Sequence, residues 1–277
     1  MKVDAHQHFW IYNPREYGWM GSGMGILKRD YLPPDLAPLL KPAAIDGTVA
    51  VQARQCLEES HWLLELADQY PFIKAVVGWV DLCSPRVDEQ LSIFARHAKF
   101  RGVRHIVHDE PDDQFMRRED FVRGIGRLAN YGLTYDLLLF PRQLPVACEL
   151  VKRFPKQPFV VDHLAKPLIK ARELSPWEAH IRRLATFPTV FCKISGMVTE
   201  ADWQHWKSAD FTPYLDVIFE CFGPKRVMVG SDWPVCTLAA RHDEVMQIVA
   251  DFLKKLSMNE QVAVWGENAQ RFYGLAD

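Results

Sequence analysis

Eight short apolar segments, rich in β-branched and aromatic residues, recur along the chain between stretches of helical periodicity. As predicted strands they are Val3–His6, Thr48–Gln52, Ile73–Val80, Gly102–Val107, Thr134–Phe140, Pro158–His163, Val190–Ser195 and Arg226–Ser231. The predicted helices are Glu59–Gln69, Arg86–Ala98, Asp120–Asn130, Gln143–Phe154, Pro176–Phe187 and Phe211–Phe222. Strands that alternate with helices in this way indicate βαβ units and a parallel sheet.

Eight such repeats within 277 residues favour closure into a (β/α)8 barrel over an open sheet. Barrels of this kind run to about 250 residues, so we expect one TIM-like barrel domain over residues 1–277. The connection from about Phe9 to Lys41 is long and carries glycine, proline and aromatic residues. A connection of this length is usually functional, often as a lid; the alternative is a surface excursion that plugs the barrel mouth.

Composition narrows the class of protein. Hydrophobic residues make up 48% of the chain and charged residues 25%, with a formal net charge of -2, which is a globular composition. There is no basic run to suggest nucleic acid, and no apolar run near the ~18 residues of a membrane span. The first predicted strand leaves no room for a signal peptide, and the six scattered cysteines form no CxxC pair. We therefore expect a cytoplasmic protein with reduced thiols, and we leave a homo-oligomer open.

Polar residues gather where the predicted strands end, which in a barrel is the active-site face. They are His6 and His8, Gln52 and Arg54, Arg104, His105 and His108, His163 and Lys166, Lys193 and Ser195, and Asp232 and Trp233. His6 and His8 project to the same side of an extended strand because side chains alternate. Each ionisable group costs free energy if it is buried without a partner. Their convergence therefore favours a catalytic site.

Each of these residues also has a structural interpretation. His163 could be a core histidine with satisfied hydrogen bonds, and Asp162 could be structural and face outward from the barrel. Asp232 could cap the helix that follows it. Lys193 and Arg104 could form ion pairs across the barrel. Glu59 is best placed to cap a helix or to put a favourable negative charge at a helix N-terminus.

Three segments carry a resemblance to a known family. "DAHQHFW", "DHLAKP" and "GSDWPV" resemble the amidohydrolase superfamily, and more closely its sugar-lactonase branch, which includes 2-pyrone-4,6-dicarboxylate and 4-sulfomuconolactone hydrolases. The text between them, including "GSGMGILKRDYLP", "GVRHIV" and "CKISGMVTEADW", is similar to L-fuconolactonase-like proteins. The resemblance extends over essentially the whole chain.

The resemblance implies that His6, His8, His163 and Asp232 form the catalytic constellation and the ligand set of any metal. Three imidazoles and a carboxylate suit zinc. Two-metal members of the superfamily carry a carboxylated lysine on the fourth strand, where this chain has Arg104. We therefore expect at most one divalent metal. Relatives that hydrolyse lactones without any ion imply that the metal is not strictly required.

The resulting hypothesis is hydrolysis of a sugar lactone, with L-fuconolactone and L-galactonolactone as the leading substrates. Asp232 would activate water, and the histidines, with Arg104 or zinc, would stabilise the oxyanion. The expected substrate-binding residues are Trp10, Gln52, Arg54, Trp79, Arg104, Lys166, Lys193 and Trp233.

Two alternatives remain open, a metal-dependent decarboxylase of the same superfamily and a non-catalytic protein that binds a sugar lactone. A serine or cysteine hydrolase is disfavoured, because the chain has no G-x-S-x-G motif and Cys192 has no base beside it in sequence.

Overall fold

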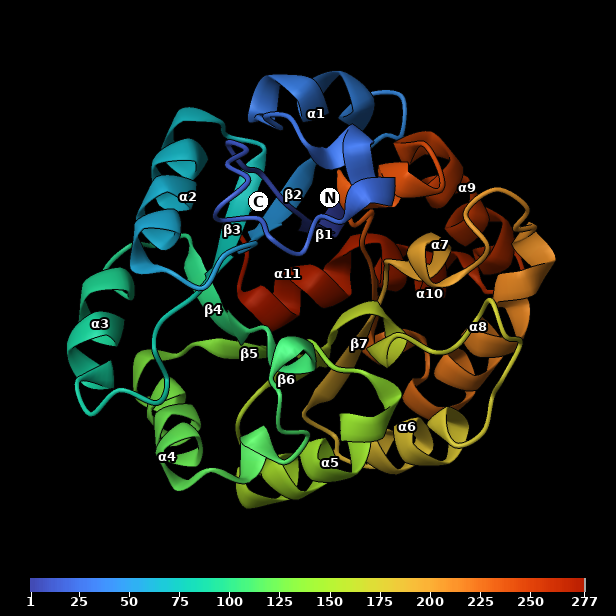
Figure 1. Ribbon diagram of the computed structural model, residues 1–277. Coiled ribbons are helices and arrows are strands. Elements are labelled where there is room, and N and C mark those ends of the chain that lie inside the picture. Colours follow the sequence, from blue (N-terminus) through green and yellow to red (C-terminus); the bar gives the residue numbers. More distant parts are fainter. Residues whose placement is uncertain (277) are drawn as a thin grey trace.

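A computed structural model describes residues 1–276 and contains one eight-stranded parallel sheet in the order β1 to β8. The strands are β1 (Val3–Gln7), β2 (Gly47–Val51), β3 (Ile73–Gly78), β4 (Phe100–His105), β5 (Thr134–Leu137), β6 (Phe159–Val161), β7 (Val190–Ile194) and β8 (Val227–Val229). The sheet closes on itself just after β8, where the Asp232 N–H donates to the carbonyl of His6 and the His8 N–H donates to the carbonyl of Trp233. The predicted (β/α)8 barrel is confirmed (Figure 1).

Helices follow the strands and surround the barrel (Figure 1). They are α1 (Pro33–Leu40), α2 (Leu57–Gln69), α3 (Val87–Phe94), α4 (Glu119–Leu128), α5 (Leu144–Arg153), α6 (Trp177–Ala185), α7 (Met197–Glu200), α8 (Ser208–Phe222), α9 (His242–Leu253), α10 (Met258–Val262) and α11 (Asn268–Tyr273). The six helices predicted from periodicity are all present, with ends moved by a few residues. Each packs an apolar stripe inward, as in α4, where Phe121, Ile125 and Leu128 are buried at helical spacing.

The segment from Phe9 to Lys41 differs from the single long loop that the sequence suggested. It contains a short 3₁₀ helix, Ser22–Leu27, and then α1, which takes the place of the first barrel helix. Two prolines open α1, at positions where a missing N–H costs nothing. A third proline, Pro38, lies inside the helix, where proline is ordinarily unfavourable.

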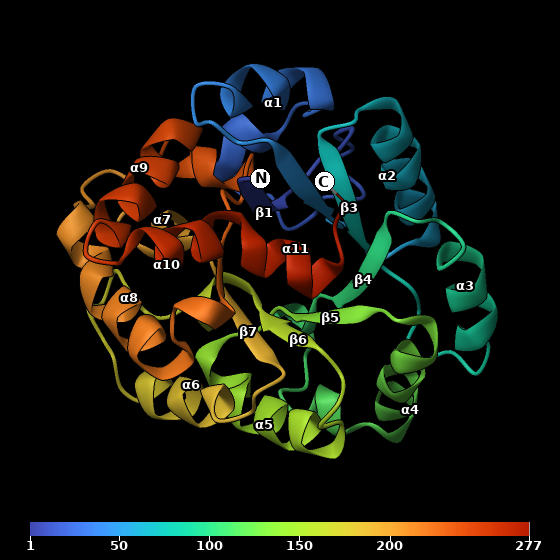
Figure 2. The same ribbon diagram turned by 180° about the vertical axis from the view of Figure 1, so that it is seen from behind.

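One end of the barrel is closed by α11. Its side chains Phe272 and Tyr273 pack against interior residues near the strand starts, such as Val3 and Val49. Figures 1 and 2 show α11 lying across the middle of the ring of strands. Because this end is filled, the opposite end, where the strands finish, is left for a functional site.

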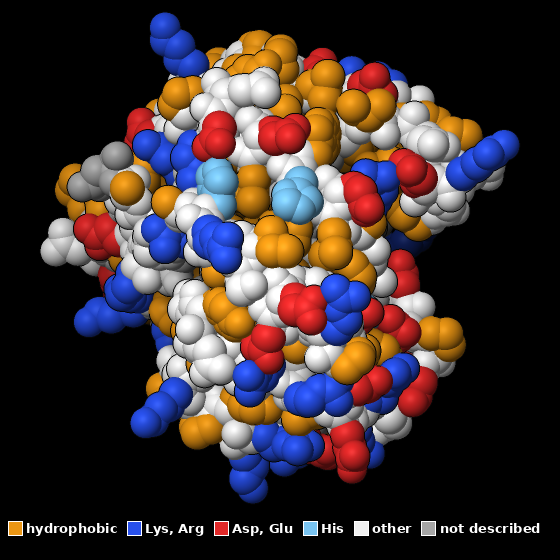
Figure 3. Space-filling view, turned by 90° about the vertical axis from the view of Figure 1, so that its left-hand side faces the viewer, with side chains coloured by type: hydrophobic (Ala, Val, Ile, Leu, Met, Phe, Trp, Pro, Cys, Tyr) orange, Lys and Arg blue, Asp and Glu red, His pale blue; other side chains and the backbone are white. Residues whose placement is uncertain are grey.

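The surface over α2 and α3 mixes acidic and basic side chains without a large patch of one sign (Figure 3). Among residues 1–276, every helix is too short or too polar to cross a lipid bilayer. All six cysteines are free thiols, as expected from their scattered positions.

Candidate active site

A cavity of about 230 Å³ opens at the carboxyl ends of the strands. It is lined by six of the residues predicted from the sequence, namely His8, Trp10, Arg104, His163, Lys166 and Asp232. His6 is fully buried and lies next to them, with its Nε2 3.2 Å from Nε2 of His8. The strand-end residues that belong to distant parts of the sequence are therefore brought to one place.

An irregularity in β1 directs His6 into the barrel. Between Asp4 and Gln7, β1 advances three residues while β2 advances two, which is the signature of a β-bulge. Ala5 already packs in the barrel interior, and the extra residue lets His6 face inward as well. Gly230 makes this approach feasible, because a Cβ there would lie 2.6 Å from the Cβ of His6.

His163 is held in place by an unusual backbone conformation. The four residues from His163 to Lys166 all have positive φ, between 51° and 57°, and so form one turn of left-handed helix. This conformation costs L-residues about 1–2 kcal/mol each. Backbone strain of this kind persists where the surrounding structure imposes it, and it is often found at functional sites. The Nδ1 atom of His163 lies 2.8 Å from the Oγ atom of Ser195, which leaves its Nε2 directed at the cavity.

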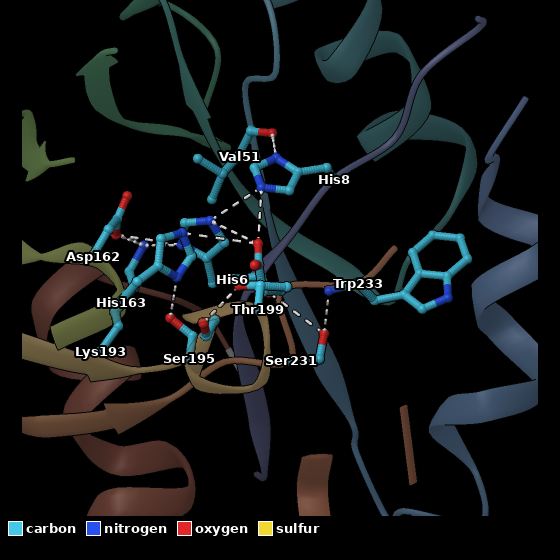
Figure 4. A network of polar contacts seen from close by, with 12 residues as sticks. His6, His8, Val51, Asp162, His163, Lys193, Ser195, Thr199, Ser231 and Trp233 are labelled. Carbon is cyan, nitrogen blue, oxygen red and sulfur yellow. Dashed lines mark hydrogen bonds and ion pairs between the residues drawn. The ribbon is translucent and has the colours of Figure 1, made fainter. Parts of the chain in front are cut away.

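The three imidazoles converge on one carboxylate oxygen. Oδ1 of Asp232 lies 3.4 Å from Nε2 of His8, 3.8 Å from Nε2 of His163 and 3.9 Å from Nε2 of His6. Figure 4 shows the rings of His6, His8 and His163 turned toward one another. Asp232 itself has a φ of 57°, so its backbone is held in the left-handed region as well. The predicted central constellation of four residues is present as a cluster.

The cluster suits a single metal ion. His8 Nδ1 lies 2.7 Å from the carbonyl of Val51, which can only accept, so in the neutral ring Nε2 carries the lone pair. Burial lowers the pKa of His6 well below its usual value, which keeps this ring neutral. The Nε2 atoms of His6 and His8 are 3.2 Å apart, close to the roughly 3.3 Å between two nitrogens on one tetrahedral zinc. With Asp232 they form a group of donors that fits a metal ion.

A cluster of buried charges adjoins His6, and Figure 4 shows two of its members, Asp162 and Lys193. Nζ of Lys193 contacts the carboxylates of Asp136 and Asp162, and Arg104 donates to Asp162 at 3.1 Å. Lys193 and Asp162 also flank Nδ1 of His6, at 3.2 and 3.3 Å. The expected ion pairs of Lys193 and Arg104 across the barrel are confirmed.

The outward orientation suggested for Asp162 is wrong. Strand alternation directs it inward, and the left-handed turn then adds the next residue, His163, to the same interior. Burial alone would raise the pKa of Asp162, but Lys193 and His6 hold it well below the usual range. Burial raises the pKa of Asp136 to about 6, against the opposing effect of Lys193.

Five of the residues predicted to bind substrate do not line the cavity: Gln52, Arg54, Trp79, Lys193 and Trp233. Lys193 is committed to the charge cluster. Gln52 bonds through its side chain to the backbone carbonyl of Arg104, and Arg54 forms an ion pair with Glu16. We leave these residues out of the proposed substrate-binding set.

The two tryptophans in that group are also engaged elsewhere. Trp233 packs edge-on against Tyr31, and the indole of Trp79 donates to Nδ1 of His105. His105 in turn lies 2.6 Å from Glu110 and stays out of the cavity, whereas His108 lines it. Of these two strand-end histidines, His108 is therefore the one that reaches the cavity.

Other cavity residues were missed or left open by sequence reasoning. They are the polar residues Asp109, Thr199 and Glu200, and the largely apolar residues Trp19, Met24, Ala53, Ile106, Leu138, Trp203, Val235 and Leu238. A signal for three of them existed, because Thr199, Glu200 and Trp203 all fall within the segment "CKISGMVTEADW" after β7. Trp19 and Met24 come from the Phe9–Lys41 segment, which therefore forms part of the cavity wall.

The fold and the site together define a barrel enzyme of the amidohydrolase type. The family model described as "Amidohydrolase" matches residues 3–275, so the chain belongs to this family. It is 43% identical to an L-fucono-1,5-lactonase of Burkholderia multivorans, over 100% of this chain and 97% of the relative. It is 35% identical to an L-fucono-1,5-lactonase of Burkholderia ambifaria, over 98% of this chain and 95% of the relative.

The similarity to a solved structure extends to the three-dimensional fold. A crystal structure of an amidohydrolase from Burkholderia multivorans, with bound zinc, has a TM-score of 0.96 at 43% identity and covers 100% of both chains. The resemblance that the strand-end motifs indicated is confirmed along the full chain.

Proposed function

We propose that this protein hydrolyses a sugar lactone to the sugar acid, with L-fuconolactone or L-galactonolactone as the preferred substrate. The observation that carries the proposal is the carboxylate of Asp232, which faces three imidazoles in a cavity lined by both polar and apolar residues. The names of the two Burkholderia relatives support the same substrate class.

Asp232 is the general base of the proposed reaction. Aspartate side chains are ordinarily ionised at neutral pH and accept a proton from water. The activated water attacks the lactone carbonyl, and the ring C–O bond breaks as the tetrahedral intermediate collapses. The protonated Asp232 then transfers its proton to the departing ring oxygen, so that the carboxylate is regenerated.

Cationic and polar groups around the carbonyl stabilise the developing oxyanion. Arg104 lines the cavity, and its Nη1 lies 3.4 Å from Nε2 of His6. A guanidinium carries a delocalised positive charge and several N–H donors, which suit a developing oxyanion. His6, His8 and Asp232, with His163 beside them, would hold at most one divalent metal, preferably zinc, which when bound would supply Lewis-acid polarisation of the carbonyl.

The proposal is tested by a pH-indicator screen of sugar lactones with and without a chelator. We expect acid release from L-fucono- or L-galactonolactone, and Asp232→Asn should lower kcat at least 100-fold while the melting temperature stays the same. Asp216→Asn, which changes an exposed aspartate, is the matched control. Release of CO₂ from an aromatic acid would instead indicate a decarboxylase, and saturable binding of the lactone without turnover would indicate a binding protein.

The proposal retains two further expectations from the sequence, a cytoplasmic location and a small-molecule lactone as the partner. The oligomeric state is left to a sizing measurement on the purified protein.

A further inference from the structure

One ion pair in the cavity wall is not used by the hydrolytic cluster. Nζ of Lys166 lies 2.6 Å from Oε1 of Glu200, and both side chains line the cavity. They are 19% and 18% exposed, so each is shielded yet open to a bound ligand. Lys166 comes from the segment after β6 and Glu200 from the end of α7.

The backbone that carries Lys166 is strained. Lys166 is the last residue of the left-handed turn that begins at His163, and its N–H donates to the carbonyl of His163 at 2.7 Å. The turn therefore places the catalytic histidine and the lysine on the same side, and both reach the cavity. A partly exposed ion pair contributes little to stability, so stability does not explain why the chain holds this residue at positive φ.

Both members of the pair retain hydrogen-bonding capacity. Within residues 1–276, the ammonium of Lys166 has Glu200 as its hydrogen-bond acceptor, and the carboxylate of Glu200 has Lys166 as its donor. An ammonium has three N–H donors and a carboxylate has two acceptor oxygens. Each group can therefore bind a ligand hydroxyl without giving up the other.

The spacing of the pair matches a particular ligand chemistry. Two hydroxyls on adjacent carbons in the gauche arrangement lie about as far apart as two hydrogen-bonded atoms, which is also the separation of Nζ and Oε1 here. One hydroxyl would donate to the carboxylate of Glu200, and the oxygen of its neighbour would accept from Lys166. Apolar residues of the cavity, including Met24 and Leu238, suit the C–H surface of the same ring.

We propose that the Lys166–Glu200 pair is the element that selects a lactone bearing a gauche vicinal diol. This inference rests on the proposed lactonase function and deepens it, because it assigns the recognition of hydroxyls to two residues outside the hydrolytic cluster. A site built around hydrogen bonds to hydroxyls rejects analogues that lack them, because its polar groups are then left unpaired.

The test compares two substrates in three variants. The substrates are the preferred sugar lactone and δ-valerolactone, which has the ester ring without hydroxyls. Lys166→Met and Glu200→Gln should each lower kcat/KM for the sugar lactone at least tenfold and leave kcat/KM for δ-valerolactone within twofold. Lys170→Met, an exposed lysine in the same segment, is the control and should change neither value.

A mono-deoxy analogue of the sugar lactone, which lacks one hydroxyl of the diol, tests whether that hydroxyl and the ion pair interact directly. Its loss of kcat/KM in the unmodified enzyme should largely disappear in Glu200→Gln or Lys166→Met, because the partner of the missing hydroxyl is already gone. Unchanged melting temperatures would show that the variants are folded.

Equal losses on both substrates, or no loss on either, would overturn the assignment of selectivity to this pair while leaving the lactonase function intact. Failure of the unmodified enzyme to hydrolyse any lactone would instead overturn the proposed function, and the inference with it.

Discussion

Gly196 controls where the ring of His163 can lie. Its φ is +61°, and a Cβ at this position would lie 2.6 Å from Nδ1 and 2.8 Å from Cγ of His163. We predict that Gly196→Ala displaces the ring from Ser195, lowers kcat at least tenfold and destabilises the fold by more than the ~1–2 kcal/mol that positive φ alone costs. Steady-state kinetics and thermal unfolding measure the two effects.

Gly132 provides the matched control for this substitution. It has nearly the same φ, +66°, but a Cβ there would meet nothing within 4 Å. Gly132→Ala should therefore show the backbone cost alone, with kcat unchanged. If the two variants lose the same stability and both keep full activity, contact with the histidine ring is not the reason for glycine at residue 196.

Glu59 makes the stability of the protein depend on pH. Its side chain is fully buried in the first turn of α2, as expected for a carboxylate at a helix start, and accepts hydrogen bonds from the N–H groups of Ala53 and Arg54. Burial raises its pKa from 4.5 to about 7 despite these bonds, a shift equivalent to about 3 kcal/mol.

The raised pKa of Glu59 determines whether the folding stability rises or falls with pH. Between pH 4.5 and 7 the unfolded chain ionises this group while the folded protein keeps it protonated, so stability falls as pH rises through this window and levels off above it. Glu59→Gln keeps the hydrogen-bond acceptor and removes the titration. The stability advantage of the variant should grow by up to about 3 kcal/mol from pH 4.5 to 7. Urea unfolding at several pH values would refute this if the difference stayed constant.

At the scale of elements, the eight strands and six of the helices were predictable. The left-handed turn and the other helices, namely α1, α7, α9, α10 and α11, were not among the predicted elements. The eight strands follow from short apolar runs, which the buried positions of a parallel barrel require. Helix α1 was missed because its three prolines argue locally against a helix, although two of them lie in its first turn. The left-handed turn from His163 to Lys166 contains no glycine, the residue that usually marks a positive φ in a sequence. Its conformation is imposed by packing around it, which no local pattern reveals.

Strand β7 contributes the cation at the centre of the interior charge cluster. Lys193 is fully buried and is the ion-pair partner of Asp136, while Asp162 has Arg104 as a second partner. Removing one member of a buried pair leaves an uncompensated charge, which costs about 3–5 kcal/mol. Lys193→Met should destabilise the protein by this amount in chemical unfolding.

A second substitution separates the charge effect from lost packing. Lys193→Met leaves the carboxylate of Asp136 without its ion-pair partner, and Asp136→Asn removes that charge. The double variant should therefore be more stable than Lys193→Met alone. A double variant that is less stable than either single variant would show that Lys193 acts through its volume rather than through its charge.

At the scale of the molecule, the active site depends on closure of the barrel. His6 and His8 stand at one end of the sequence and Asp232 near the other, and two backbone hydrogen bonds between β1 and the segment after β8 hold them together. The carboxylate of Asp4 strengthens this closure, because it accepts hydrogen bonds from both the N–H and the hydroxyl of Ser231.

The central residues of the site could be predicted from their positions at the strand ends, since a barrel gathers these positions at one face. The residues of the cavity wall depend on loop paths, which the strand pattern does not encode.

Because the four candidate metal ligands meet only in the closed barrel, metal binding should stabilise the whole molecule. A ligand that binds the folded chain alone raises its stability in proportion to the logarithm of ligand concentration. Zinc at about a hundredfold excess over Kd should raise the melting temperature of chelator-treated protein by about 5–10 °C. His8→Ala removes one donor and should lose most of this shift, whereas His205→Ala, which changes a histidine whose side chain is 77% exposed, should keep it. An equal shift in both variants would place the bound zinc away from the cavity, because His8 would then contribute nothing to holding it.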